Sequence, residues 1–262
     1  MKQFKKTLAL VLAAMLVLVT FAGCGAKADA PAETEAQVPE ATGEKLIMAT
    51  NASFPPYEFK GDSGAIEGID AEIAAAIAAK LGRTLEIVDT EFGSIIGGVQ
   101  TGKFDMGMAG MTVTEERKQS VNFSDTYAVG VQSIIVKEDS DITGPEDLAG
   151  KMIGVQQDTT GHIYAEGDYG KDNVFPYRTG NDAVQALVSG KVDAVIIDNE
   201  PAKSYVASNE GLKILDTAYA EEEYAICVAK ENTALLDNIN NALAALKADG
   251  TVDSIIAKYI AA

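Results

Sequence analysis

The sequence is poor in the side chains that bind metals and form cross-links. It has two cysteines and one histidine in 262 residues, and it has no tryptophan. No metal-ligand cluster, nucleophile motif or phosphate-binding loop appears in it. We therefore expect no disulfide framework, no metal and no cofactor. Cys227 lies in an apolar run and is expected to be a buried thiol.

Basic residues are also scarce. The chain has 21 Lys and Arg against 39 Asp and Glu, which gives a formal net charge of -18. Such a surface repels nucleic acid and anionic membranes, so neither is an expected partner. The apolar fraction of 47% is nevertheless ample for the core of one large domain or of two medium ones.

Long apolar runs are missing except at the N-terminus. Lysines near the start precede an apolar stretch that ends at Ala22 and Gly23. This layout is typical of a secretion signal, which we assign to residues 1–23. A retained membrane anchor is the alternative, but the stretch falls short of the roughly 20 residues that span a bilayer. We expect the protein to be exported.

Cys24 directly follows Phe21, Ala22 and Gly23. This ending resembles a bacterial lipoprotein box, in which the cysteine becomes the lipid-modified first residue, although Phe21 replaces the usual leucine. A free cysteine is the alternative. The rest of the segment 24–44 is rich in alanine, glutamate and proline, which predicts a solvated linker that holds a domain away from the membrane.

Beyond the linker, strand-like and helix-like segments alternate. An apolar strand at 45–50 precedes a helix at 70–82, for which Asp70 is the predicted N-cap. The order βαβαβ predicts a mainly parallel sheet that is covered by helices. The other segments of this half are a strand at 84–90, a helix at 94–103 and a strand at 104–110.

The second half repeats this scheme. VQTGKFDMGMAG (99–110) aligns with LVSGKVDAVIID (187–198), which places Ala109-Gly110 opposite Ile197-Asp198. We therefore expect two similar lobes that each end this strand at an equivalent place; chance similarity of two helix–turn–strand units is the alternative. The other predicted segments are strands at 151–157 and 173–178, a helix after Thr159-Thr160 and a helix at 182–190.

The C-terminal part carries two further predicted helices, the last at 252–260. If they pack on the first lobe, two strands near 127–136 and 224–230 cross between the lobes and form a hinge. We accordingly assign each part of the chain to one of the two lobes. Lobe 1 comprises 45–130 and 225–262, and lobe 2 comprises 131–224.

Arg117 stands in the first turn of a helix that Thr114 is expected to cap, where the helix dipole favours negative charge. A guanidinium there can form a two-pronged pair with a carboxylate, assisted by the N–H and hydroxyl of Thr112. The alternative is a surface arginine that pairs with Glu115 or Asp125.

Other residues that suit a ligand site also follow predicted strands. Phe54 lies on a proline-stiffened loop, and Phe92 holds the equivalent place after the next strand. Asp198 can either cap a helix or accept an ammonium group, and Thr159 and Thr160 can supply N–H and hydroxyl donors. A carboxylate binder, an ammonium acceptor and aromatic walls together suit a free α-amino acid.

Several phrases carry a family resemblance in their order along the chain. They are TNASFPPYEF, EGIDAEIAAAIAAKLG, GKFDMGMAGMTVTEERKQSVNFSDTY, GVQQDTTG and GKVDAVIIDNEPA. Over roughly residues 45–262 the chain resembles the extracellular solute-binding proteins of polar amino-acid ABC importers, the family that includes the glutamine- and lysine/arginine/ornithine-binding proteins. The resemblance implies a two-lobed, periplasmic-binding-protein-like (type II) α/β fold that closes over one amino acid and docks on a membrane permease. It also implies a lipoprotein anchored outside the cytoplasm.

Matched positions of the family imply a role for each site residue. Arg117 would hold the ligand α-carboxylate with Thr112 and the N–H of Thr160, while the Gly110 carbonyl and the Asp198 carboxylate would take the α-ammonium. The two phenylalanines would sandwich the aliphatic part of the ligand side chain. The implied ligand-binding positions are Asn51, Phe54, Phe92, Ala109, Gly110, Thr112, Arg117, Gln156, Thr159, Thr160 and Asp198.

The sequence departs from its relatives where selectivity is decided. Asn51 stands where several relatives carry aspartate, Gln156 where a glutamine binder has lysine, and Asp158 where glycine usually precedes the paired threonines. Because Asn51 and Gln156 are both neutral, we expect a polar uncharged, glutamine-like ligand. Arginine, lysine or cystine is the alternative, and Glu58, Glu91 or Asp158 could meet a cationic tail.

Two functions of other classes were weighed. A dehydratase-type enzyme on the same fold would need a positioned acid or base, and the single histidine, His162, is expected to be solvated on a helix. A receptor sensing domain would require a membrane span or signalling module downstream. We expect a monomeric binding protein whose partners are the free amino acid and the permease, and no catalysis.

Overall fold

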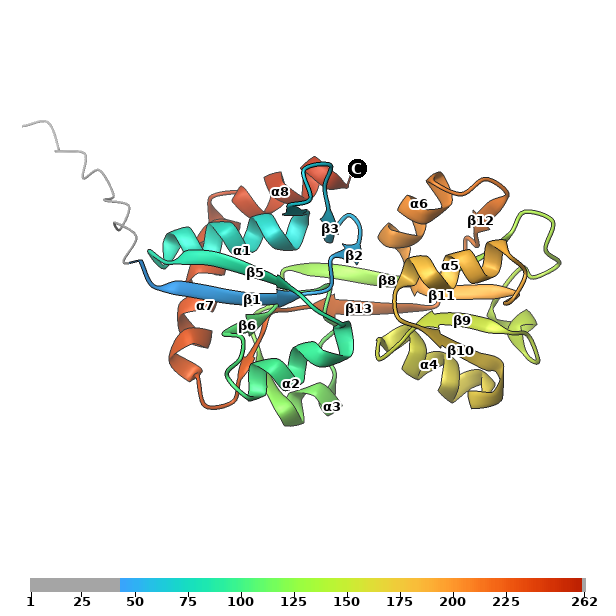
Figure 1. Ribbon diagram of the computed structural model, residues 1–262, viewed down its shortest axis with the longest axis horizontal. Helices are drawn as coiled ribbons and strands as arrows, with labels where there is room; N and C mark the ends of the chain where they lie inside the picture. The colour runs from blue at the N-terminus through green and yellow to red at the C-terminus, as the bar shows by residue number, and fades with distance from the viewer. Residues whose placement is uncertain (1–42, 261–262) are drawn as a thin grey trace, which may run out of the picture. The chain divides into compact units, whose positions relative to one another are not determined.

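The computed structural model describes residues 43–260, all of which belong to one compact unit, Val38–Ala262 (Figure 1). The predictions for the signal peptide, Cys24 and most of the linker lie outside the described residues. No helix within 43–260 is both long and apolar enough to cross a membrane.

The first sheet belongs to lobe 1 and has the strand order β5-β1-β6-β14-β7. β1 pairs in parallel with β5 and β6, whereas β14 is antiparallel to β6 and β7. The strands are β1 (Lys45–Thr50), β5 (Thr84–Asp89), β6 (Met106–Gly107), β7 (Val121–Phe123) and β14 (Cys227–Ala229). The helices of this lobe are η1 (Phe92–Ser94), α1 (Ile69–Lys80), α2 (Ile95–Gln100), α3 (Glu115–Ser120), α7 (Thr233–Ala248) and α8 (Thr251–Tyr259).

The second sheet belongs to lobe 2 and has the order β10-β9-β11-β8-β12, with β13 also paired to β8. Its strands are β8 (Ala128–Lys137), β9 (Ile153–Gln156), β10 (Val174–Tyr177), β11 (Ala194–Asp198), β12 (Leu212–Ile214) and β13 (Ala220–Tyr224). Its helices are α4 (Thr160–Tyr169), α5 (Gly180–Val188), α6 (Asn199–Ala207), η2 (Pro145–Leu148) and η3 (Lys171–Asn173). A small third sheet joins β2 (Ser53–Phe54), β3 (Glu58–Lys60) and β4 (Ile66–Glu67).

Both main sheets share one plan. In each, three parallel strands have the first strand in the centre, and an antiparallel strand pairs with the third: β14 with β6, and β8 with β11. Both sheets are therefore mixed. The expected two-lobed α/β fold is confirmed, and the shared plan agrees with the predicted internal repeat.

Two adjacent strands connect the lobes, β8 and β13 (Figure 1). They pair in antiparallel register from Ala220↔Gln132 to Tyr224↔Ala128. The Tyr127 N–H donates to the Tyr224 carbonyl at 2.9 Å, and the chain then enters the first sheet as β14. The two crossings thus lie side by side, as a hinge requires. The lobe boundaries assigned from the sequence fall at these strands and stay a prediction.

The structure tests several local predictions about helix caps and burial. Thr114 caps α3, and Cys227 is a buried free thiol, as expected. Two predictions are wrong. Gly68, not Asp70, is the N-cap of α1, and Asp70 points into the core, where it accepts hydrogen bonds. His162 does lie on a helix, but its side chain is only 15% exposed because it packs beside Glu166.

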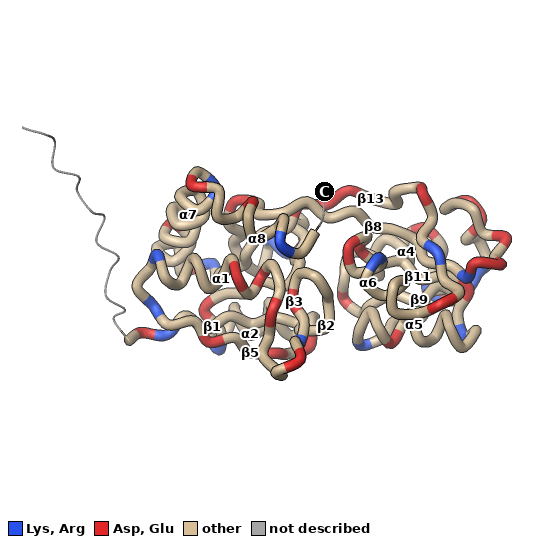
Figure 2. The backbone as a smooth tube through the Cα atoms, turned by 90° about the horizontal axis from the view of Figure 1, so that it is seen from above, with Lys and Arg blue, Asp and Glu red and all other residues tan. Residues whose placement is uncertain are grey.

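The acidic residues are spread over both lobes (Figure 2). On β13, Glu221 and Glu223 are exposed while Glu222 between them is buried. The overall negative charge therefore does not mark a site, whereas a buried acid on a connecting strand does call for an explanation.

Candidate ligand-binding site

One cavity gathers every position that the sequence assigned to the ligand. The chain reaches it mostly at or just beyond the carboxyl ends of β1, β6, β9 and β11, where ligands of parallel sheets bind. The structure adds Glu58, Gln132, Ile197 and Tyr224 to the lining. That these residues bind a ligand stays a prediction.

Arg117 occupies the third position of α3, and its backbone N–H is bonded to the Thr114 hydroxyl at 3.1 Å. Its guanidinium donates from Nη1 to the Thr112 carbonyl (2.8 Å) and from Nη2 to the Asp158 carbonyl (3.2 Å). The alternative pair with Glu115 does not form, since Glu115 pairs with Lys118. A guanidinium has five N–H donors, so donors remain for an incoming carboxylate.

The environment of Arg117 keeps it accessible to a ligand but largely out of water. The residue is 9% exposed, and its guanidinium carbon lies 5.2 Å from the centre of the Phe92 ring. Burial lowers the pKa of Arg117 from its ordinary value, whereas the nearby Glu222 raises it. A guanidinium stays charged in proteins, so the cavity contains one fixed cation.

Thr112 is engaged differently from the expectation. Its hydroxyl donates to Glu222 Oε2 at 3.0 Å, and the same oxygen accepts from Gln132 Nε2 at 2.9 Å. The Thr112 and Thr160 hydroxyl oxygens lie 3.4 Å apart. In this structure the Thr112 proton is therefore directed to Glu222, and a ligand carboxylate would have to rely on Arg117, Thr160 and backbone N–H groups.

Sequence reasoning missed Glu222 and Gln132. The run of three glutamates looks like a solvated surface, but strand alternation turns its middle member inward. Gln132 sits opposite Ala220 on the paired connecting strand. The period of two along a strand places Glu222 and its two glutamate neighbours on opposite faces, whereas the register of β13 against β8 decides which face is buried.

Asp198 caps a helix, which is one of the two roles left open in the sequence, and its role as an ammonium acceptor stays a prediction. Its Oδ1 accepts the Glu200 N–H at 3.1 Å and so caps α6. Its Oδ2 accepts the Val131 N–H (3.0 Å) and the Tyr224 hydroxyl (2.7 Å). Asp198 is 1% exposed and lines the cavity, and burial raises its pKa to about 6.

Gly110 brings backbone to the cavity at the equivalent place of lobe 1. Its φ of +51° is a conformation that favours glycine, and a Cβ there would lie 2.9 Å from Phe54 Cε1. Its N–H donates to Asp70 Oδ2 at 2.8 Å. The position thus needs a residue without a side chain. Its backbone is fixed by the hydrogen bond to the buried Asp70 carboxylate.

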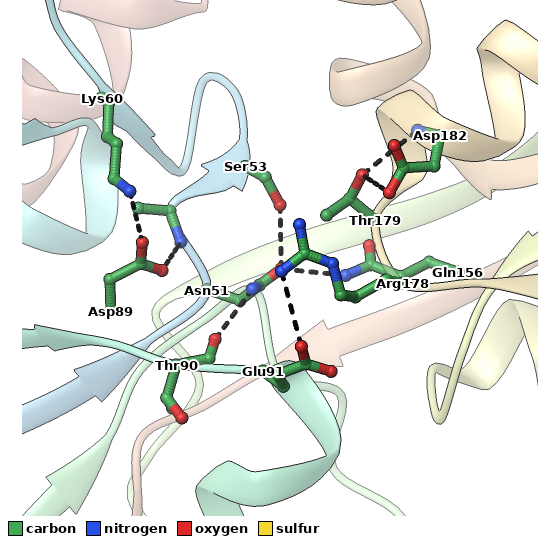
Figure 3. A network of polar contacts seen from close by, with 11 residues as sticks. Asn51, Ser53, Lys60, Asp89, Thr90, Glu91, Gln156, Arg178, Thr179 and Asp182 are labelled. Atoms are coloured by element: carbon green, nitrogen blue, oxygen red, sulfur yellow. Dashed lines mark hydrogen bonds and ion pairs between the residues drawn. The ribbon is translucent and has the colours of Figure 1, made fainter.

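Two amide side chains, Asn51 and Gln156, line part of the cavity and lie next to each other (Figure 3). Gln156 Nε2 donates to Asn51 Oδ1 at 3.0 Å across the two lobes, and Asn51 Nδ2 donates to the Thr90 carbonyl at 2.8 Å. Glu91 does not reach this part, because it faces Arg178 at 3.5 Å. Amide side chains offer both hydrogen-bond donors and acceptors to this part of the cavity.

Asp158 adopts the backbone conformation that the family's glycine would suit. Its φ is +65°, and it is the one non-glycine residue of 43–260 with a positive φ. Its side-chain oxygen lies so close to Gly93 that a Cβ on Gly93 would come within 2.2 Å of it. The residue therefore packs against the loop of the opposite lobe beside the cavity.

Comparison with known proteins supplies the family. Residues 46–262 match the family described as bacterial extracellular solute-binding proteins, family 3. The chain is 35% identical over 228 residues to the arginine-binding extracellular protein ArtP of Bacillus subtilis (strain 168), covering 84% of this chain and 88% of that protein. It is 30% identical over 269 residues to the ABC transporter glutamine-binding protein GlnH of the same organism, covering 98% and 97%.

A solved structure agrees closely with the fold. An ancestral arginine-binding protein bound to glutamine matches with a TM-score of 0.80 and 42% identity, covering 83% of this chain and 98% of that one. Both the fold and the family are thus shared with amino-acid-binding proteins.

Proposed function

The chain belongs to family 3 of the bacterial extracellular solute-binding proteins, and we propose that it binds one free L-α-amino acid with a neutral, amide-bearing side chain, as glutamine has. Its general role is that of a polar amino-acid-binding, non-enzymatic component of an ABC transporter. The permease is its expected partner in the membrane.

The observation that carries the proposal is that Arg117 and Asp198 line the same cavity from opposite lobes. A free α-amino acid carries a carboxylate and an ammonium group, so it can pair with both charges at once. Contacts to both lobes also favour the closed form, because a ligand shifts an equilibrium only through differential contacts.

The preference for a neutral ligand side chain is supported by the part of the cavity that amide side chains line. Asn51 and Gln156 there are uncharged and offer donors and acceptors. Arginine is the second candidate, because Glu58 is 1% exposed and lines the same cavity. Relatives named for arginine binding support it as well.

Replacing Arg117 by alanine tests the carboxylate assignment. Truncating one partner of a buried charge pair costs about 2–5 kcal/mol, so binding should weaken by roughly 30-fold or more in titration calorimetry. The melting curve of the empty protein should stay nearly intact. Arg83→Ala, whose guanidinium pairs with Glu44 instead, is the matched control and should bind normally. Normal affinity in Arg117→Ala would end the assignment.

A thermal-shift screen of the proteinogenic amino acids tests the ligand class, because a binder raises apparent stability by mass action. Glutamine should give the largest shift. A larger shift with arginine would replace the neutral ligand by the second candidate. No shift with any amino acid would reject amino-acid binding by this chain.

We further propose that Cys24 carries a lipid anchor and that residues 24–44 tether a monomeric, two-lobed domain outside the cell membrane. The support is the sequence around Cys24 and the family's extracellular location. Cys24→Ser should move the protein from the membrane fraction to the soluble fraction after export, and an unchanged distribution would refute the anchor.

A further inference from the structure

Two buried carboxyl groups meet at the cavity, one in its lining and one behind it. Glu58 on β3 is 1% exposed, and Asp70 on α1 is fully buried. The two side chains are hydrogen-bonded to each other. No N–H or hydroxyl of residues 43–260 donates to Glu58 Oε2 or to Asp70 Oδ1. Two carboxyl groups can hydrogen-bond only if one of them carries a proton, so the pair shares one.

The surrounding donors show which member is ionised. Asp70 Oδ2 accepts the Gly110 N–H at 2.8 Å and the Tyr127 hydroxyl at 2.9 Å, and both bonds favour its charged form. Burial, assisted by Asp70, raises the pKa of Glu58 well above its ordinary value. Burial raises the pKa of Asp70 to about 6, against these hydrogen bonds. The shared proton therefore sits on Glu58.

The neighbours of this pair add negative charge and do not neutralise it. Neither carboxyl forms an ion pair with a lysine or arginine among the described residues. The titratable groups that interact with the pair are acids and phenols: Tyr57, Tyr127, Asp198 and Tyr205. Loss of the shared proton would place two like charges in contact, which is strongly unfavourable.

The pair acts on the ligand through Gly110. The Asp70 carboxylate holds the Gly110 N–H, and this bond fixes one face of a turn whose φ is +51°. We propose that Glu58 and Asp70 share one proton and serve as positioning residues, which hold the Gly110 turn so that its carbonyl can meet the ligand's ammonium group. The link to the ammonium rests on the proposed function, whereas the shared proton does not.

The pH dependence of binding, measured by calorimetry with glutamine and with arginine, tests this role. Between pH 7 and pH 9.5 the wild-type affinity should fall, partly because the ligand's own amine loses its proton. In Glu58→Gln an amide N–H replaces the shared proton, so the fall should be smaller by about 3-fold or more, which corresponds to about 0.7 kcal/mol. Glu210→Gln, an exposed control, should behave like the wild type.

The outcomes are distinct. Glu58→Gln should also bind more tightly at pH 7 than Glu58→Ala, which cannot donate to Asp70. The same alkaline fall in Glu58→Gln and Glu210→Gln, or equal affinity of the Gln and Ala variants, would overturn the positioning role. A smaller alkaline fall in Glu58→Gln could not come from a merely structural residue, because the isosteric amide keeps the shape of the site and removes only the titration.

The empty protein provides a readout that does not depend on any ligand. Glu58 has a raised pKa in the folded state, so its stabilisation is present below its ordinary value of 4.5 and is lost as pH rises toward the folded value. The melting temperature of the wild type should therefore fall relative to Glu58→Gln above about pH 4.5. A constant difference would overturn the shared proton, even if no amino acid bound and the proposed function had failed.

Discussion

The two equivalent strand ends reach the same cavity with different chemistry. After β6 in lobe 1, Gly110 presents backbone, and the carboxylate of Asp70 stands behind it. After β11 in lobe 2, the carboxylate of Asp198 itself faces the cavity. The repeated scaffold supplies the place, and the residue at the strand end decides whether backbone or side chain is presented to the cavity.

Removing the charge at the lobe 2 strand end should have the largest effect. Asp198→Asn leaves a good helix N-cap in place but removes the anion that faces the ligand's ammonium. Binding in calorimetry should weaken by about 30-fold or more, since truncating one partner of a buried charge pair costs roughly 2–5 kcal/mol. Asp216→Asn on the exposed surface should bind normally. Equal affinity in both variants would break the comparison, because the lobe 2 end would then carry no special charge.

Blocking the lobe 1 strand end should have a smaller effect on binding and a clear effect on stability. In Gly110→Ala, a non-glycine residue at positive φ costs about 1–2 kcal/mol, and the new Cβ would press on Phe54. We expect about 10-fold weaker binding, because a shift in Gly110 displaces one ammonium acceptor, at ~1.4 kcal/mol per tenfold. Gly211→Ala at φ +80° has open space around it and should lower stability alone.

The same comparison can be sharpened by pH. Asp198 has its pKa raised to about 6 by burial, so its carboxyl gains a proton as pH falls through that value. Ligand affinity should therefore fall by up to about tenfold per unit below pH 6, whereas Asp198→Asn should lack this fall. In the empty protein the sign is opposite: stability from Asp198 is present below its ordinary value and is lost as pH rises through about 6. Parallel changes of affinity and stability would contradict the assignment.

Local pattern in the sequence predicted the scaffold better than it predicted the contacts behind the site. The alignment of Gly110 with Asp198 and the cap at Thr114 depend on short-range periodicity and capping, and the structure agrees with them. Asp70 was assigned as a cap because it precedes an apolar run. In the sequence, an acid that caps a helix and an acid that is buried in the core look the same. Only tertiary contact distinguishes the two cases, since the Gly110 N–H that Asp70 accepts lies 40 positions away.

Glu222 shows the same limit for charge. A run of acids is normally a solvated face, and two of the three glutamates on β13 are exposed. The buried one is fixed by partners from Thr112 and Gln132, which belong to other segments of the chain. Its inward position depends on the register of β13 against β8, which no local property of the sequence determines.

The smallest expected effect concerns Asp158, which lies beside the cavity on lobe 2. Its φ of +65° costs about 1 kcal/mol for a residue with a side chain, so Asp158→Gly should stabilise the empty protein by about that amount in thermal unfolding. Its recorded hydrogen bonds come from the backbone, so none is lost. If the ligand is neutral, glutamine affinity should change by less than about 2-fold, or ~0.4 kcal/mol. A selective loss of arginine affinity would instead show that Asp158 meets a cationic tail, and it would add a second carboxylate to the lobe 2 side of the comparison.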